Sequence, residues 1–256
     1  MNVLGHLWHD ILLVWTFFTR VPAPRFTTKR TLAQALWALP LVSLVLGGVQ
    51  VALFWGLSQV FEIGEGGAVE ALLGFFLVLL PLILTGALHW DGLADLADGM
   101  GVGKDRRLAV MRDPTIGAFG VLTLVAVFVL QVILMIGLLG LLEPHAVIQT
   151  LLIVALLSRQ TMAYMWAISR AEDGQNKTAK GKPSLFVSLA PWAFFLGALI
   201  GLDLIAYPLV LVFIAVLALL LWGLRRLLPS LSGDALGATQ VLSETLLLLL
   251  ILVSHA

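Results

Sequence analysis

Three aspartates in segment 89–99 are the residues of this sequence with the clearest chemical potential. Asp91, Asp95 and Asp98 follow one another at spacings of four and three residues. On an α-helix, which turns about 100° per residue, this spacing places them in a stripe about 60° wide. Stacked carboxylates repel one another, so we expect a cation between them. Hard oxygen ligands favour Mg²⁺, with Mn²⁺ or Ca²⁺ as alternatives, over zinc.

A solvated acidic turn at a helix end is the alternative interpretation of this segment. That interpretation does not predict the glycines at positions 92, 99, 101 and 103. His89 precedes the aspartates, and it is equally consistent with a substrate contact and with a residue that caps a helix. We therefore take the three aspartates as candidate catalytic and metal-binding residues, and His89 as a candidate substrate contact.

A basic segment follows the aspartates and contains Arg106, Arg107 and Arg112. Because a guanidinium binds phosphate oxygens bidentately, arginines near metal-binding carboxylates suit a phosphate ester. Arg112 and its neighbour Asp113 are therefore candidate substrate-binding residues. Membrane topology alone explains Arg106 and Arg107 fully, whereas for Arg112 topology and substrate binding are equally good explanations.

Further candidates lie closer to the carboxyl terminus. Glu244 stands inside an apolar run, where a carboxylate costs about 2.5–3.5 kcal/mol and is functional by default. We expect it, together with Asp234, to add ligands to the same metal site, with Arg159 as a counter-ion and substrate contact. An ion pair between helices that performs no chemistry is the alternative for Glu244. In the polar segment 170–183, Asn176 and Lys177 are candidates for closing over a ligand, although a plain connector explains this segment as well.

The elements that must position these residues follow from composition. Of 256 residues, 60% are hydrophobic and 12% are charged, and the mean hydropathy is +1.04. A soluble domain carries about 25% charged residues, and the apolar residues here gather in runs about as long as a bilayer core is thick. The chain is therefore a multi-pass membrane protein whose surroundings are lipid. A soluble enzyme, a secreted scaffold and a nucleic-acid partner are excluded, and the absence of cysteine excludes disulfides and thiolate metal sites.

The apolar runs predict an all-α fold, a single transmembrane helical bundle that occupies residues 1–256. About seven spans are predicted, at 32–61, 68–90, 116–142, 146–169, 184–203, 205–224 and 238–254. Residues 3–18 are too short and too polar to span. On a helix they would place His6, His9 and Asp10 on one side and Trp8 and Trp15 on the other, a pattern typical of a helix in the membrane interface.

Basic residues indicate the orientation. Lysines and arginines, among them Arg20, precede the first predicted span or follow the second, fourth and sixth, except Arg159 in the inner half of span four. The loops on the opposite side contain no lysine or arginine, although they contain several acidic residues. By the positive-inside rule, the amino terminus and the candidate site face the cytoplasm.

Four segments, in this order, resemble the cobalamin synthase family, also called adenosylcobinamide-GDP ribazoletransferases. They are FFTRVPAP at 17–24, GALHWDGLADLADG at 86–99, Met111-Arg112-Asp113 with Gly117 and Gly120, and GDALGA at 233–238. The resemblance covers essentially the whole chain. Two positions depart from the family pattern, since Ala87 replaces a usual glycine and Val241 stands where many members carry an acid.

The resemblance implies a late step of vitamin B12 assembly, at the cytoplasmic (inner) membrane of a bacterium or archaeon. Such an enzyme joins α-ribazole, or its 5′-phosphate, to adenosylcobinamide-GDP, releases GMP, and requires Mg²⁺. It implies metal ligands or catalytic carboxylates at Asp91, Asp95, Asp98, Asp234 and Glu244, and phosphate or nucleotide contacts at His89, Arg20 and Arg112. Phosphoryl transfer needs mainly metal clamping, positioning and charge neutralisation, which these residue types supply.

Three other classes compete with this interpretation. An ion-coupled secondary transporter also uses buried carboxylates, but near the bilayer midplane, whereas most of these motifs lie at predicted cytoplasmic ends. A CDP-alcohol phosphotransferase would carry an Ala-Arg pair soon after Asp-Gly, and the Asp-Gly-Leu-Ala-Asp at 91–95 lacks that arginine. A purely structural scaffold has no use for the acidic triplet. Self-association and association with other B12 enzymes are left open by the sequence.

Overall fold

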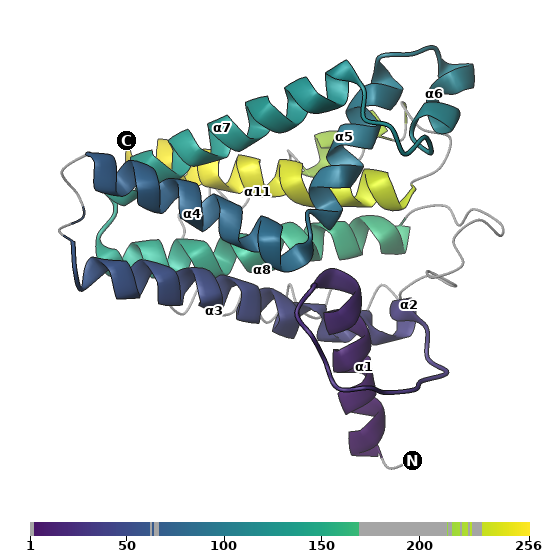
Figure 1. Ribbon diagram of the computed structural model, residues 1–256, viewed down its shortest axis with the longest axis horizontal. Helices are drawn as coiled ribbons and strands as arrows, with labels where there is room; N and C mark the ends of the chain where they lie inside the picture. Colours follow the sequence, from purple (N-terminus) through teal and green to yellow (C-terminus); the bar gives the residue numbers. More distant parts are fainter. Residues whose placement is uncertain are drawn as a thin grey trace.

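Figure 1 shows the computed structural model, an elongated bundle of helices. The structure describes residues 3–61, 63, 67–168, 214, 217–220, 222–224, 226 and 232–256. Within these residues the regular elements are helices and no strand occurs, which confirms the all-α prediction. The predicted span 184–203 and most of 205–224 lie outside the described residues.

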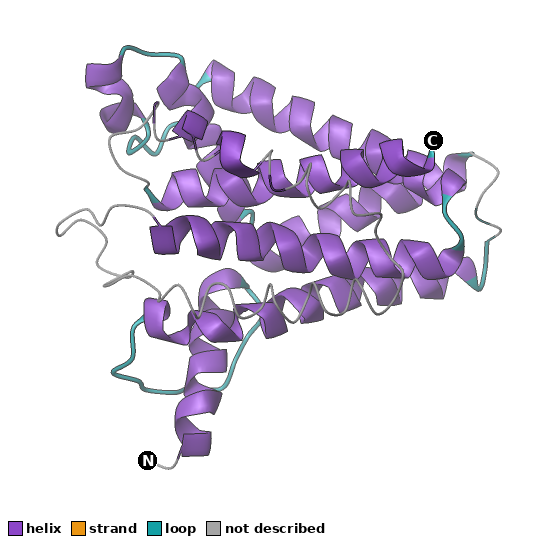
Figure 2. Cartoon of the chain, turned by 180° about the vertical axis from the view of Figure 1, so that it is seen from behind, coloured by secondary structure: helices purple, strands orange, loops and turns teal. Residues whose placement is uncertain are grey.

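Five described segments are long and apolar enough to cross a membrane, and they lie side by side along the long axis of the molecule (Figures 1 and 2). They are Leu32–Ser58, which comprises α2 (Leu32–Ala35), η1 (Leu36–Ala38) and α3 (Leu39–Ser58), then α4 (Ala68–Thr85), α7 (Ala118–Leu141), α8 (Pro144–Ile168) and α11 (Gly233–His255). They correspond to the first four predicted spans and the last. Helix α8 is central, since 78% of its most apolar window is buried against 22% for α7.

The predicted span 68–90 is wrong at its carboxyl end. Helix α4 ends at Thr85, and Gly86 and Ala87 both take left-handed backbone conformations, with φ of 63° and 56°. These two residues turn the chain into a separate, shorter helix, α5 (Leu88–Met100). Apolar residues continue across the turn, so hydropathy does not reveal the break. Ala87 is the one described non-glycine residue with positive φ, a conformation that costs an L-residue about 1–2 kcal/mol.

The last span begins earlier than predicted. Helix α11 begins at Gly233, because the Ser232 hydroxyl caps it by accepting a hydrogen bond from the Ala235 N–H at 3.2 Å. A serine at this position satisfies one of the free N–H groups of the first turn. Asp234 therefore belongs to the first helical turn and not to a loop, which fixes its direction relative to the rest of α11.

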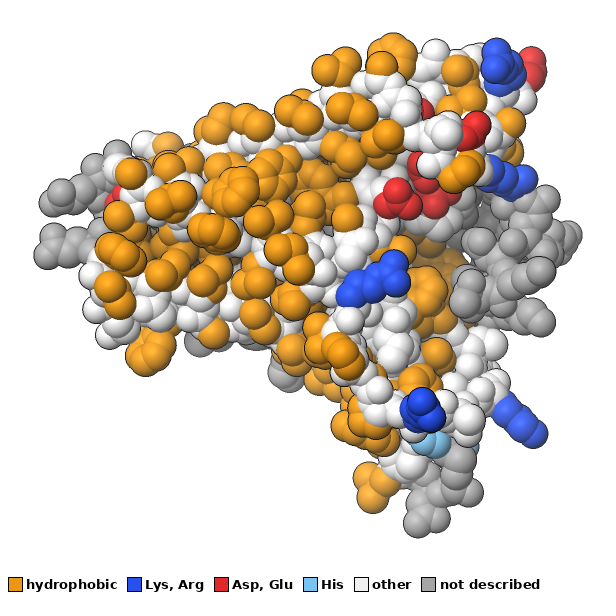
Figure 3. Space-filling view, viewed as in Figure 1, with side chains coloured by type: hydrophobic (Ala, Val, Ile, Leu, Met, Phe, Trp, Pro, Cys, Tyr) orange, Lys and Arg blue, Asp and Glu red, His pale blue; other side chains and the backbone are white. Residues whose placement is uncertain are grey.

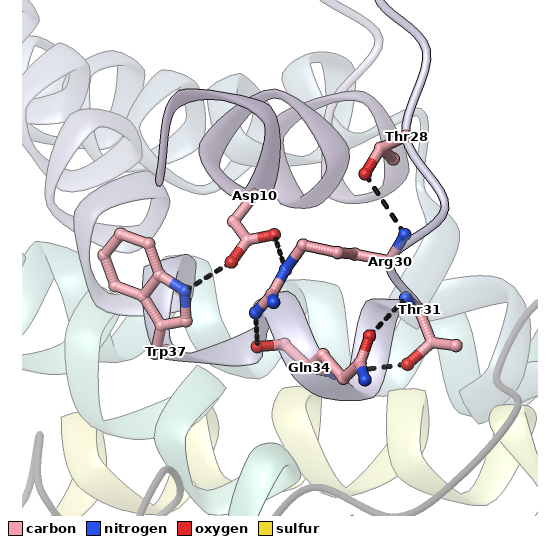
Figure 4. A network of polar contacts seen from close by, with 6 residues as sticks. All are labelled: Asp10, Thr28, Arg30, Thr31, Gln34 and Trp37. Atoms are coloured by element: carbon pink, nitrogen blue, oxygen red, sulfur yellow. Dashed lines mark hydrogen bonds and ion pairs between the residues drawn. The ribbon is translucent and has the colours of Figure 1, made fainter. Parts of the chain in front are cut away.

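The amino-terminal helix α1 (Val3–Phe18) has the predicted bounds and runs across the bundle axis (Figure 1). Its second half is anchored, since Val14 and Phe18 are buried in an apolar cluster with α2, η1 and α3. Asp10 completes the attachment by accepting hydrogen bonds from Arg30 Nε at 2.5 Å and Trp37 Nε1 at 2.8 Å (Figure 4). Apolar side chains near its amino end, such as that of Trp8, are exposed, and its place in the membrane interface stays a prediction.

Candidate functional site

The candidate site lies at the end of the bundle where α5 crosses α11. Two glycines bring these helices into backbone contact. A Cβ at Gly92 would lie 2.5 Å from the Asp234 carbonyl oxygen, and a Cβ at Gly237 would lie 3.1 Å from the His89 Cα. Because a side chain at Gly92 would overlap the Asp234 backbone, glycine at this position lets the crossing set Asp234 beside the acidic stripe of α5. Figure 3 shows acidic side chains gathered at this end of an otherwise largely hydrophobic face.

The negative charges at this crossing repel one another. We call these carboxylates the acidic group; it comprises Asp91, Asp95 and Asp234, with Asp98 beside them. The pKa of Asp95 is raised to about 6 by partial burial, and then by the negative charges of Asp91, Asp234 and Asp98. The cluster therefore stores repulsion that a bound cation would relieve. The structure brings together the four aspartates named from the sequence, and their chemical roles stay predictions.

The donor set of the acidic group suits a hard divalent cation. Its donors are carboxylate oxygens, Asp91 is exposed, and Asp95 and Asp234 are partly exposed. Within the described residues, no three histidine or acidic side chains already converge to hold a metal ion. Mg²⁺ is commonly bound by one or two carboxylates together with substrate phosphates and water, so the residues fit Mg²⁺ without a preformed cage.

Asp98 has a second role that the sequence did not indicate. Its carboxylate is 8% exposed and accepts hydrogen bonds from the backbone N–H groups of Gly117, at 2.7 Å, and Gly120, at 2.8 Å. A Cβ at either glycine would lie 2.4 Å from a carboxylate oxygen of Asp98. Asp98 thus caps the amino end of α7 and ties it to α5, and the two glycines make room for its carboxylate. Its predicted part in metal binding and catalysis stays a prediction.

The prediction that Glu244 shares a metal ion with Asp234 is corrected by the geometry. Both residues are on α11, ten positions apart, and a rise of about 1.5 Å per residue separates them by about 15 Å. Oxygen ligands of one Mg²⁺ lie about 2.1 Å from the ion, so these two side chains cannot reach a common one. Glu244 instead accepts a hydrogen bond from Gln240 Nε2 at 2.8 Å, and its charge interacts with that of Arg159.

His89 lies in the interior at the start of α5. It is 3% exposed, and its ring stacks on Phe18 with 5.8 Å between ring centroids. Burial, and secondly the charge of Arg159, lower the pKa of His89 to about 3. The imidazole is therefore neutral at physiological pH, and any substrate contact it makes is a neutral hydrogen bond. Its Nε2 has no hydrogen-bond partner within the described part of the chain.

The remaining candidates are near the site, at its edge, or outside the described residues. The exposed Arg20 packs on the α4–α5 turn, where a Cβ at Gly86 would lie 2.5 Å from its Nε. The charge of Arg112 acts on Asp234, which places a cation beside the acidic group. Asp113 accepts hydrogen bonds from the Thr115 backbone N–H and hydroxyl. Asn176 and Lys177 lie outside the described residues.

Sequence reasoning missed Ser158 and Gln240. Gln240 Nε2 donates to Ser158 Oγ at 3.1 Å as well as to Glu244, which links α11 to α8. Both residues are almost completely buried. A glutamine four positions before a glutamate inside an apolar run was the available signal, because side chains at this spacing meet on a helix.

Comparison with known proteins shows the same family along the whole chain. The family model described as cobalamin-5-phosphate synthase matches residues 10–252. Proteins named adenosylcobinamide-GDP ribazoletransferase are similar throughout. The one from Sinorhizobium medicae (strain WSM419) is 32% identical over 97% of both chains, and the one from Rhizobium meliloti (strain 1021) is 33% identical over 97% of both. The one from Shewanella woodyi is 32% identical over 98% of both. No solved structure matches the chain significantly.

Proposed function

The chain belongs to the cobalamin-5-phosphate synthase family, and from this premise we propose that it transfers α-ribazole, or its 5′-phosphate, onto adenosylcobinamide-GDP. The products are GMP and adenosylcobalamin or its 5′-phosphate. The observation that carries the proposal is the acidic group at the α5–α11 crossing, where partial burial, and then repulsion among the carboxylates, raise the pKa of Asp95 to about 6.

In the proposed reaction, the 5′ oxygen of ribazole attacks the phosphorus attached to cobinamide. The new P–O bond forms as the pyrophosphate bond to GMP breaks, and the attacking oxygen gives up its proton, if it carries one, to a carboxylate or water. One or two of the carboxylates of Asp91, Asp95 and Asp234 would hold Mg²⁺, or Mn²⁺ in its place, which would neutralise the pyrophosphate when bound. Arg112, whose charge already acts on Asp234, would contact phosphate oxygens, and Arg20 would do so from the α4–α5 turn.

Two packing features would keep these groups in register. The Gly92 contact holds the first turn of α11 against α5, and the Asp98 cap holds α7 against the opposite end of α5. Phosphoryl transfer depends mainly on positioning and electrostatics. Rigid attachment of the acidic group to three helices therefore serves the reaction directly. We place the site at the cytoplasmic face of the inner membrane, as the basic residues predict.

The direct test is a transfer assay on the full chain in nanodiscs. Adenosylcobinamide-GDP and α-ribazole, or its 5′-phosphate in a parallel reaction, are supplied with Mg²⁺, and GMP and the corrinoid product are followed with and without EDTA. We expect GMP release that depends on the metal and matches cobalamin formation. An Asp105→Asn variant, altered at an exposed aspartate of α6 (Lys104–Val110), is the matched control and should stay active. A folded, metal-loaded protein that forms neither product would contradict the proposal and favour another intramembrane phosphotransferase or a transporter.

A further inference from the structure

A buried arginine and a glutamate face each other between α8 and α11 without touching. Arg159 is 2% exposed, and its charge and that of Glu244 act on each other. Among the described residues, however, the one salt bridge within 4.0 Å joins Arg30 and Asp10. The Arg159 nitrogens and the Glu244 carboxylate oxygens are therefore more than 4.0 Å apart, so the two charges interact without a direct salt bridge.

Arg159 and Glu244 each have one polar atom without a hydrogen-bond partner among the described residues. Arg159 Nη1 donates to the Ala155 carbonyl at 3.0 Å, while its buried Nε has no partner within the described part of the chain. One oxygen of Glu244, Oε2, accepts from Gln240 Nε2. The described residues provide no hydrogen bond to Oε1. Within the described residues, the pair thus presents an N–H donor on α8 and a carboxylate oxygen on α11 that have no hydrogen-bond partner.

Arg159 and Glu244 lie at the far end of a row of polar residues that starts at the acidic group and includes His89. We call this row the polar seam. Asp234, Gly237 and Glu244 fall within about 80° of one face of α11 at the helical turn of about 100° per residue. Gly237 packs on the His89 backbone, and the charge of Arg159 acts on His89. The seam therefore runs from the acidic group, past His89, to Arg159 and Glu244.

An open pair of this kind is costly unless something completes it. An uncompensated buried charge destabilises the fold strongly, and an unsatisfied buried N–H adds to that cost. The completing group must accept a hydrogen bond from Arg159 Nε and donate one to Glu244. A phosphate does not meet both demands, because it would set a negative charge against the carboxylate. An amide edge does, since its carbonyl and N–H lie side by side.

We propose that Arg159 and Glu244 together bind an amide edge of the substrate, with its carbonyl oxygen toward Arg159 and its N–H toward Glu244. The inference rests on the proposed function, whose substrate supplies this chemistry twice. The guanine of the GDP moiety carries a carbonyl beside a ring N–H, and cobinamide carries carboxamides. The ten residues from Asp234 to Glu244 on α11 span about 15 Å, so a pyrophosphate at the acidic group would place its base further along α11. Glu244 is thus a substrate-specificity residue instead of a metal ligand.

The test measures binding without turnover, in nanodiscs and without metal, so that it is independent of the transfer assay. The probes are GMP, AMP and dicyanocobinamide, with dissociation constants taken from titrations of intrinsic tryptophan fluorescence or from calorimetry. The variants are Glu244→Gln, which exchanges the carboxylate for an amide, and Glu244→Asp, which keeps the charge but shortens the reach. Gln131→Leu is the matched control, because it breaks the 2.8 Å bond from Gln131 Nε2 to the neighbouring Thr245 hydroxyl at the same depth.

We expect the wild type to bind GMP at least ten times more tightly than AMP, and Glu244→Gln and Glu244→Asp to lose that preference while Gln131→Leu keeps it. A second outcome also supports the subsite. In it, the wild type binds GMP and AMP equally but binds dicyanocobinamide, and the Glu244 variants bind dicyanocobinamide at least tenfold more weakly. The corrinoid carboxamides would then supply the amide edge. Equal affinities of the wild type and both Glu244 variants for every probe overturn the subsite. An active wild type in the transfer assay would then leave the proposed function untouched.

Discussion

Asp10 and the acidic group at the α5–α11 crossing are two carboxylate sites that the protein treats in opposite ways. Asp10 is 1% exposed, and its two oxygens accept from Arg30 and Trp37 (Figure 4). In the acidic group, partial burial and then the neighbouring carboxylates raise the pKa of Asp95 to about 6. The first carboxylate is satisfied by the protein itself, and the second is left to be satisfied by a ligand.

Both kinds of carboxylate occur within the aspartate stripe of α5, as Asp98 shows. It shares one helical stripe with Asp91 and Asp95, yet its two oxygens already accept backbone hydrogen bonds from α7. In the hydrogen bonds that its carboxylate accepts, Asp98 resembles Asp10 more than it resembles Asp91 and Asp95. The comparison teaches that hydrogen-bond satisfaction, more than residue type or spacing, separates a carboxylate that holds the fold from one that is free to act on a substrate.

The largest effect is expected at the acidic group. Asp91→Asn removes one charge from it and should lower transfer by about 10²–10³-fold, with little change in melting temperature, because Asp91 is exposed. Rates of GMP release and thermal unfolding of the same nanodisc sample test this directly. Full activity in this variant would sink the assignment of the acidic group as the reaction centre.

The response to pH should sharpen the contrast. Because the pKa of Asp95 is raised to about 6, protons compete with the metal below that pH. The concentration of Mg²⁺ that gives half-maximal transfer should rise up to about tenfold for each pH unit below 6 and change little above 7. Mg²⁺ titrations between pH 5 and 8 measure it. In Asp95→Asn, whose side chain does not titrate, this rise should be smaller in any residual activity.

Substitution of Asp98 tests whether it belongs with Asp10. Asp98→Asn replaces one acceptor oxygen with a donor that opposes a backbone N–H, and it should cost about 2–3 kcal/mol of unfolding free energy. Gly120→Ala should lower the melting temperature in the same way, because its Cβ would lie 2.4 Å from the Asp98 carboxylate. Mg²⁺ affinity should change less than in Asp91→Asn. A larger loss of Mg²⁺ affinity than of stability would instead make Asp98 a metal ligand.

Asp10 should show the opposite balance from Asp91. Asp10→Asn weakens the charge-assisted bond to Arg30 and should lower the free energy of unfolding by about 1–2 kcal/mol. The rate of transfer by the folded protein should be unchanged, since Asp10 bonds to Arg30 and Trp37, which lie outside the candidate site. Unfolding and transfer are measured on the same sample, and a loss of rate without a loss of stability would contradict a structural role.

The smallest effect is expected at the turn that starts α5. Ala87→Gly relieves a left-handed backbone conformation with φ of 56° and should raise the free energy of unfolding by up to about 1 kcal/mol. Transfer should be unchanged, because the turn keeps its shape. A lower melting temperature would show that the Ala87 methyl group contributes more by packing than its backbone conformation costs.

Much of the fold could be predicted because lipid imposes it locally. A bilayer requires long apolar helices whose backbone groups are satisfied internally, so the five described spans and the bounds of α1 could be read from hydropathy and helical pattern. The break after Thr85 could not, because apolar residues continue through Gly86 and Ala87. The early start of α11 was missed because a polar first turn resembles a loop until the Ser232 cap is seen.

The candidate site divides in the same way. The sequence by itself determined the residue types, the one-sided stripe of aspartates and the family, because these depend on local spacing and on motif order. Only the tertiary structure decided that Asp234 joins the stripe through Gly92, that Asp98 caps α7, and that Glu244 belongs with Arg159 and Gln240 about 15 Å of helix away. The reason is physical, since contacts between helices depend on how closely their backbones can approach, and no single segment encodes that.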